Sequence, residues 1–104
     1  MARFEVRTNL NRASRARVPY LIELQADLLA DLRTRLVAPL VPAARVGPPA
    51  SRLNPVFRIG NRNFVMDTAL IAGVPAAQLG EVVVSLADRN AEILGALDFL
   101  ISGI

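Results

Sequence analysis

The residues able to carry chemistry are few, because this 104-residue chain has no His, Cys or Lys. Their absence excludes Ser-His and Cys-His nucleophiles, zinc sites with His or Cys ligands, a P-loop lysine and a Schiff base. Nine carboxylates, twelve arginines, hydroxyl groups and Tyr20 remain. These groups could still serve a ribonuclease that lacks His, but we expect no metal site and no cofactor.

Asp27 and Asp31 form the one carboxylate pair that resembles an acid/base dyad. No further group nearby completes such a site, so we interpret both as solvated carboxylates at the edges of a turn. Between them lie Leu28 and Leu29. Adjacent side chains of an extended segment point to opposite faces, so at least one of these leucines should be exposed.

The arginines are concentrated in the first part of the chain. Residues 1–62 hold eleven arginines and four carboxylates, a balance of +7, whereas residues 63–104 hold one arginine and five carboxylates, a balance of −4. A basic segment of this kind suits nucleic acid or an acidic peptide. We favour a third reading, an ordinary solvated surface in which Arg replaces Lys.

A basic loop over residues 9–17 carries Arg12, Arg15 and Arg17, and we expect it to be mobile. It is a plausible docking surface for an acidic partner. It holds no aromatic residue on which a base would stack, which weakens an RNA-binding interpretation. We expect no direct sequence-specific binding of nucleic acid.

The sequence ends on Ile101, Ser102, Gly103 and Ile104, where most chains carry a few polar residues. Two isoleucines and a glycine at this position indicate a terminus that is buried or used for contact.

Several short segments have the alternation or β-branched content of strands, and Gly60–Asn63 supplies a hairpin turn. The predicted strands cover residues 3–7, 18–24, 36–41, 55–59 and 64–66, with a further short strand within 67–73. Pro39 predicts that the 36–41 segment is an edge strand or contains a bulge. Residues 42–54 read as a long loop, and residues 74–80 as a single helical turn.

An amphipathic helix is predicted from about Ser85 to the end of the sequence, with Ser85 and Asp88 resembling a capping box. Its apolar stripe consists of Ile93, Leu97, Leu100 and Ile104, with Leu94 and Ile101 beside it. Strands followed by one helix predict a small, mainly β barrel with a helix packed against it, formed as a single domain over residues 1–104.

Composition places the chain among folded proteins, since 53% of its residues are hydrophobic and 20% are charged. No apolar stretch approaches the roughly 20 residues that span a bilayer, and the Arg-rich N-terminus lacks the apolar region of a secretory signal. We expect a cytoplasmic protein that does not enter membranes.

Taken together, the motifs resemble the CcdB family, the toxins of toxin-antitoxin modules that poison DNA gyrase. The matching residues are Phe4 and Val6, Ser14-Arg15, Gln25 with Asp27, Pro39-Leu40, Pro55-Val56 through Ile59-Gly60, Val74-Pro75, Gly80-Glu81 and the final Gly103-Ile104. Their order and spacing extend over the whole chain.

The resemblance implies a homodimer of SH3-like barrels of short antiparallel strands, as in CcdB and MazF, that binds the gyrase A subunit and traps the gyrase-DNA cleavage complex. It also implies a protein that is not an enzyme and has no catalytic residue. The implied gyrase-binding residues are Leu28, Leu29, Asp98, Ile101, Ser102, Gly103 and Ile104. A CcdA-like antitoxin would neutralise the toxin over the loops 9–17 and 45–53. The antitoxin-binding residues expected there are Arg12, Ser14, Arg15, Arg17, Arg45 and Arg52.

One residue departs from the family pattern, which has Trp before the terminal Gly-Ile where this chain has Ser102. An aromatic contact typically contributes on the order of 2 kcal/mol at an interface. The alternatives are therefore a weak toxin, a toxin for a different gyrase, or a non-toxic relative. An endoribonuclease toxin of the MazF or Kid type, which has the same barrel, is the other alternative, although no convincing catalytic set is found.

Overall fold

The computed structural model describes residues 3–25, 33–47 and 52–103. Its strands are β1 (Glu5–Asn9), β2 (Tyr20–Glu23), β3 (Thr34–Pro42), β4 (Val56–Ile59), β5 (Arg62–Met66), β6 (Ala72–Pro75) and β7 (Leu79–Ser85). Its helices are the short 3-10 segments η2 (Ala43–Arg45), η3 (Thr68–Leu70), η4 (Ala76–Gln78) and η5 (Ala87–Arg89), followed by α1 (Asn90–Ser102).

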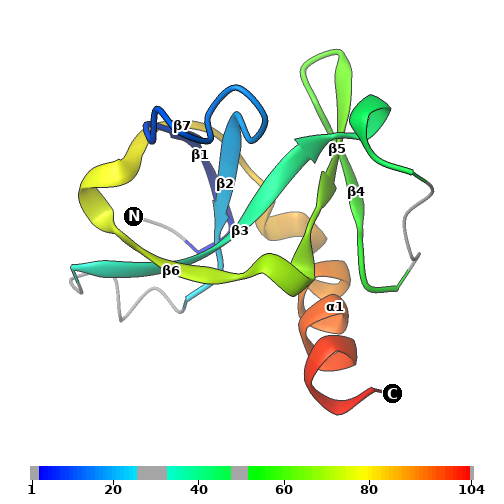
Figure 1. Ribbon diagram of the computed structural model, residues 1–104. Helices are drawn as coiled ribbons and strands as arrows, with labels where there is room; N and C mark the ends of the chain where they lie inside the picture. The colour runs from blue at the N-terminus through cyan, green and yellow to red at the C-terminus, as the bar shows by residue number, and fades with distance from the viewer. Residues whose placement is uncertain (1–2, 26–32, 48–51, 104) are drawn as a thin grey trace.

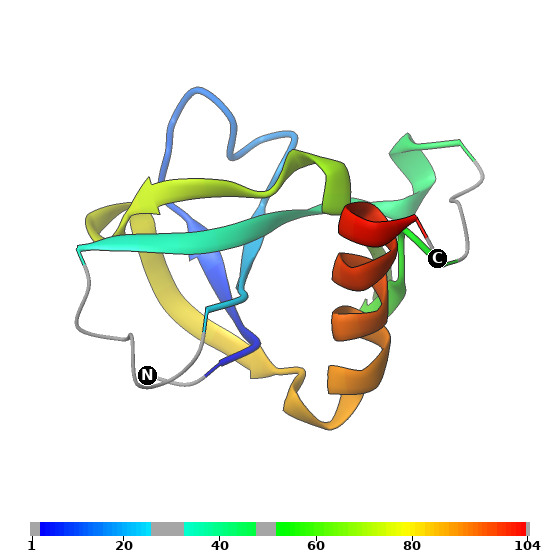
Figure 2. The ribbon, with the colours of Figure 1, turned by 90° about the horizontal axis from the view of Figure 1, so that it is seen from below.

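The strands form one antiparallel sheet in the order β4-β5-β3-β2-β1-β7, and β6 also pairs with β3. Figures 1 and 2 show the sheet curling into a half-barrel, with α1 packed beside β4 and β5. The predicted mainly β, SH3-like architecture with a C-terminal helix is confirmed. No described helix is long and apolar enough to cross a membrane.

The core fills the inside of the half-barrel. Phe57, Ile22, Leu40 and Met66 come from four different strands and are fully buried. The helix adds Ile93, which is also fully buried. Because α1 packs through this side, its opposite side is left facing outward.

The β4-β5 hairpin follows its prediction closely. Ile59 pairs with Arg62 across a two-residue turn, and Gly60 supplies the positive φ of 64° that such turns require. Phe57 and Phe64 pair across the two strands and both are buried, so the hairpin delivers two aromatic rings to the core.

Pro39 was predicted to mark an edge strand or a bulge, and β3 is not an edge strand. Its pairing with β2 also passes through Pro39 without a shift in register. β3 pairs with β2 along one edge and with β6 and β5 along the other. The β6 pairing ends at Val37 and the β5 pairing begins at Leu40, so Pro39 faces the gap between them, where its carbonyl accepts the N–H of Asp67 at 2.9 Å. The N–H that proline lacks would point into the same gap, so no strand pairing is lost.

Of two predictions between residues 74 and 89, one is confirmed and one is wrong. The single helical turn predicted within residues 74–80 is present as η4, directly after Pro75, and the ends of that range belong to β6 and β7. The helix begins at Asn90 and not near Ser85, whose hydroxyl accepts the N–H of Ala87 at 3.2 Å without capping a helix. Strand β7 was not predicted. It forms over a run of β-branched residues, Val82–Val84, because valine favours extended backbone.

The loop between β1 and β2 is held at its base by hydrogen bonds of the Asn9 side chain. Asn9 is buried, and its amide donates to the Ser14 hydroxyl at 3.0 Å and to the Val18 carbonyl at 2.9 Å. Its side-chain oxygen accepts the N–H of Asn11 at 3.0 Å. The loop therefore presents its arginines on a frame fixed at Asn9.

Candidate functional site

The tip of α1 is shaped by a glycine cap. Gly103 has a φ of 74°, and its N–H donates to the carbonyl of Phe99 at 2.9 Å. Glycine is the usual residue here because a side chain is strained in this left-handed conformation. The cap ends the helix cleanly and fixes the direction in which the chain leaves it.

The outward side of the last two turns combines apolar and polar groups. Leu94, Asp98, Ile101 and Ser102 follow helical spacing and are all exposed. The Ile101 side chain is 81% exposed, more than the other exposed large apolar residues of the described chain. Burying such a side chain in a partner would gain about 2 kcal/mol.

Ser102 is turned back on its own helix. Its hydroxyl donates to the carbonyl of Asp98 at 2.6 Å, the common bond of a serine to the residue four positions earlier. The hydroxyl is thereby used within the helix, and Ile101 is the most exposed large apolar residue among the described residues of the tip.

Four of the predicted gyrase-contact residues, Asp98, Ile101, Ser102 and Gly103, are brought together in the last turn and cap of α1. The other three predicted contacts, Leu28, Leu29 and Ile104, lie outside the described residues, as do Asp27 and Asp31.

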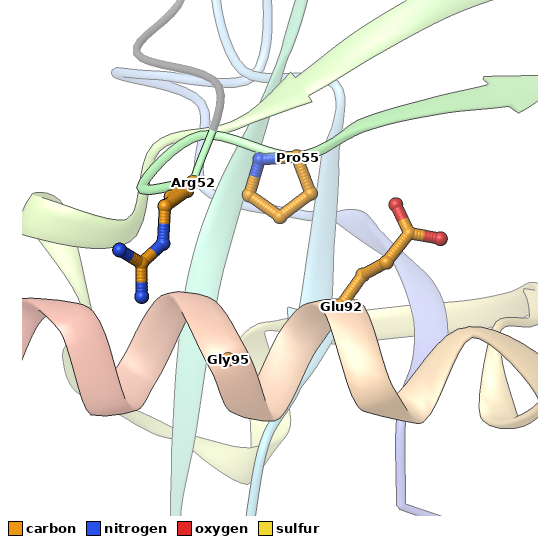
Figure 3. A pocket seen from close by; sticks show the side chains of 4 residues that line it. All are labelled: Arg52, Pro55, Glu92 and Gly95. Carbon is orange, nitrogen blue, oxygen red and sulfur yellow. The ribbon is translucent and has the colours of Figure 1, made fainter. Parts of the chain in front are cut away.

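A hollow of about 250 Å³ lies on the same helix, lined by Arg52, Pro55, Glu92 and Gly95. Figure 3 shows Arg52 and Pro55 above the helix, with Gly95 on the helix below them and the Glu92 side chain rising from the helix at the right. The guanidinium of Arg52 stands 4.7 Å from the ring centre of Phe99. Arg52, predicted with the antitoxin-binding residues, is therefore beside α1, where sequence reasoning did not place it.

The start of α1 carries an exposed ion pair between Arg89 and Glu92, with Nη2 of Arg89 2.9 Å from a carboxylate oxygen of Glu92. The Arg89 guanidinium also lies 4.9 Å from the ring centre of Phe57. The hydrogen bond from Arg89 lowers the pKa of Glu92 and is assisted by the attraction between the charges, while partial burial opposes it. Glu92 thus keeps a negative charge at the edge of the hollow.

The remaining predicted antitoxin-binding residues gather around the β1-β2 loop, away from α1 (Figure 1). Arg12, Arg15 and Arg17 are exposed, and Ser14 is half-buried against Asn9. Arg45, also exposed, donates to the carbonyl of Ala16 at 3.4 Å. That contact connects η2 with the loop and adds a fourth arginine to the same basic surface.

Sequence reasoning missed a buried charge cluster on the face of the sheet opposite the main core. Glu23 is 2% exposed, and its two oxygens accept from Arg7 and Arg35, each at 3.1 Å. Arg7 also donates to the carbonyl of Gly80 at 2.7 Å. The cluster joins β1, β2, β3 and β7, and the alternation of Glu23 with the buried residue Ile22 was the signal available in the sequence.

This cluster is the closest approach to the Arg and carboxylate set that an endoribonuclease of this barrel would need. Both carboxylate oxygens of Glu23 are already hydrogen-bonded to arginine, so Glu23 is poorly arranged to accept a proton from a substrate. Its arrangement is that of a structural ion pair.

Comparison with protein families gives one match that covers nearly all of the molecule. The family model described as CcdB protein matches residues 3–103. The matched region includes all the described strands and helices, the buried core and the described part of the helix tip. This chain therefore belongs to the CcdB family, the toxins of toxin-antitoxin modules.

Proposed function

We propose that this chain binds the A subunit of DNA gyrase through the tip of α1 and traps the enzyme with its DNA cleaved. The observation that carries the proposal is the exposure of Ile101, at 81%, on a glycine-capped helix end in a CcdB family protein. The family resemblance assigns the same tip to gyrase contact.

The proposed contact surface consists of Asp98, Ile101, Ser102 and Gly103 together with Leu28, Leu29 and Ile104. Ile101 supplies apolar area, and Asp98 supplies a charge that fixes the orientation of the partner. The protein acts by wedging into gyrase, so it needs no catalytic residue and no cofactor. Its own contribution is binding energy directed at the cleaved state of the enzyme.

We propose that a CcdA-like antitoxin neutralises the toxin through its basic surface. The residues concerned are Arg12, Ser14, Arg15, Arg17 and Arg45 around the β1-β2 loop, and Arg52 beside α1. The exposed arginines favour carboxylates on the antitoxin and a fast, salt-sensitive association. A single disordered segment of the antitoxin that reaches from the β1-β2 loop to Arg52 would also cover α1, the helix that carries the proposed gyrase contact.

We propose further that the working unit is a homodimer, as in the family. The support here is the outward side of α1 before the proposed gyrase-contacting tip, where Leu94 is 36% exposed. Sedimentation equilibrium of the purified chain tests this arrangement, and a monomer at all micromolar concentrations would exclude it.

A second candidate is a relative without toxicity towards gyrase, and Ser102 favours it. The small hydroxyl at this position is bonded within the helix, so the tip offers no aromatic anchor. Growth after induction without antitoxin separates the two candidates, since normal growth fits the second and loss of viability fits the first.

Calorimetric titration of the purified chain into the gyrase A subunit of its own organism tests the binding step. We expect saturable binding that is lost in Ile101→Asp and kept in Arg15→Glu/Arg17→Glu, with the opposite pattern for the antitoxin. Absence of binding by the unmodified chain, whose folding circular dichroism confirms, would reject the proposal.

A further inference from the structure

The sheet has two ends, and both are open in the described part of the chain. β7 pairs with β1 alone, and at the other end β4 pairs with β5 alone. An end strand leaves one row of backbone N–H and C=O groups available for a further strand. Because the sheet curls, these two ends border the same opening of the half-barrel (Figures 1 and 2).

β7 is unusually apolar for such a position. Val82, Val83 and Val84 are 49%, 39% and 37% exposed, and Glu81 is the only charged side chain of the strand. Proteins usually protect an end strand with lysine, proline or inward-pointing charge. Three consecutive exposed valines instead offer apolar area along the strand.

The backbone of β7 is available where the pairing is regular. Val84 lies opposite Val6, Ser85 lies opposite Glu5, and the N–H of Leu86 donates to the carbonyl of Phe4 at 2.9 Å. Bonding directions alternate along an antiparallel strand, so Leu86 and Val84 face β1 and the backbone groups of Ser85 face away from it.

A groove of about 450 Å³ runs from β7 to the β4-β5 hairpin, within the size range of specific binding sites. Its lining comes from three places, the hairpin, β2 and β7: Tyr20, Arg58, Ile59, Gly60, Asn61, Arg62, Phe64, Val83 and Val84. The two ends of the sheet therefore share one groove, with apolar side chains along it.

The groove carries positive charge that nothing in its lining neutralises. Arg58 and Arg62 are both exposed, and no carboxylate lines the groove. Neither arginine forms an ion pair with another residue in the described ranges. Arg62 rests 5.4 Å from the ring centre of Phe64, which positions its guanidinium over the hairpin.

The aromatic residues of the groove favour a peptide over a nucleic acid. Phe64 is buried, and the half-buried Tyr20 packs against it edge to face with ring centres 5.1 Å apart. Single-stranded nucleic acid is held by bases stacked on accessible rings. An extended peptide instead needs a free strand edge, apolar contacts at alternate positions and charge at its side chains, all of which the groove provides.

We propose that an extended acidic peptide binds in this groove as an added strand on β7, with its carboxylates on Arg58 and Arg62 and its apolar side chains on Val83 and Val84. The site is separate from the helix tip and from the basic loop, so it does not depend on the proposed action on gyrase.

Fluorescence anisotropy with a labelled, end-capped peptide of alternating valine and glutamate tests the site on the full chain. We expect saturable binding that is about tenfold weaker in Arg58→Glu/Arg62→Glu. The matched control is Arg15→Glu/Arg17→Glu, which makes the same charge change in the basic loop and should leave the affinity unchanged. Equal weakening by both pairs, or no binding at all, would overturn the proposal.

Further probes separate the possible occupants. A valine-lysine peptide and an aspartate-only peptide should both bind more weakly than the valine-glutamate peptide, and an aspartate-only peptide of equal affinity would contradict strand addition. Tighter binding of an oligouridine that depends on Arg58 and Arg62 would assign the groove to nucleic acid. Hydrogen exchange of the Ser85 backbone amide should slow when the peptide binds. If this amide already exchanges slowly without peptide and the peptide does not change its rate, the edge is occupied by a second copy of the chain and the proposal is overturned.

Discussion

The hydroxyl of Ser102 donates a 2.6 Å hydrogen bond to the backbone carbonyl of Asp98, one helical turn earlier. In a regular helix that runs to Ser102, the same carbonyl also accepts the backbone N–H of Ser102, so the hydroxyl is a second donor to it. Next to Ser102, Ile101 is the most exposed large apolar residue of the described chain. The side chain at which this chain departs from the family pattern is thus turned back onto its own helix.

Restoring the family residue at this position should strengthen gyrase binding. Ser102→Trp adds a large apolar side chain at the proposed interface, with an expected gain on the order of 2 kcal/mol, or about thirtyfold in Kd. Ser102→Ala is the control and should change Kd little, because the hydroxyl is bonded within the helix. Surface plasmon resonance on the immobilised A subunit measures both, and a large loss in Ser102→Ala would show that the hydroxyl itself contacts gyrase.

Removing the apolar side chain of the tip should separate function from stability. Ile101 is 81% exposed, so Ile101→Ser should alter the free energy of unfolding by no more than about 0.5 kcal/mol while it abolishes growth arrest. Val46→Ser changes another exposed apolar residue, 40% exposed and located after η2, and should remain toxic. Urea denaturation measures the stability, and viability after induction measures the toxicity. If the Ile101→Ser protein remains toxic, the helix tip is not the gyrase contact.

Breaking the charge cluster of the sheet should destabilise the fold. Glu23→Gln leaves Arg7 and Arg35 without the carboxylate that holds them, at an expected cost of about 3 kcal/mol in the free energy of unfolding. Glu81→Gln, an exposed change on β7, should stay within about 0.5 kcal/mol of the unmodified protein. Chemical denaturation compares them, and equal stability of the two variants would show that the cluster contributes little.

The ion pair at the start of α1 predicts a small acid dependence of stability. The pKa of Glu92 is lowered from its ordinary value of 4.5 by the hydrogen bond from Arg89. The contribution of the pair, about 0.3 kcal/mol, is therefore complete above pH 4.5 and disappears as the pH falls through the lowered pKa. An NMR titration should show the Glu92 pKa rising towards its ordinary value in Arg89→Gln; an unchanged pKa would mean that Arg89 does not cause the shift.

The fold was predictable wherever local sequence and tertiary structure agree. Gly60 and Asn61 between two apolar strands specify the β4-β5 hairpin, and the apolar spacing of α1 specifies which of its sides is buried. Pro39 misled because its effect depends on which partner its missing N–H faces, and the gap between β5 and β6 is created by the fold. β7 was missed because residues 79–85 lack the alternation of a half-buried strand. Its valines are all exposed, and the register of its pairing with β1 shifts between Val82 and Val84.

The candidate sites show the same division. The proximity of Asp98, Ile101 and Ser102 was predictable because they are neighbours along one helix. The contact of Arg45 with the β1-β2 loop and the packing of Arg52 on Phe99 were not, since both join segments distant in sequence. The ion pairs of Glu23 could not be predicted either, because the sequence alone does not give the strand register that places Arg7 and Arg35 beside it on the neighbouring strands.

The central claim is tested most directly by incubating the purified chain with DNA, ATP and the gyrase of its own organism, and measuring DNA covalently attached to the A subunit after denaturation. The account predicts that covalent complexes accumulate with increasing toxin, and that deletion of Gly103 and Ile104 abolishes them in a chain that remains folded. Absence of covalent complexes at micromolar toxin, whether or not gyrase binds the toxin, would contradict the account.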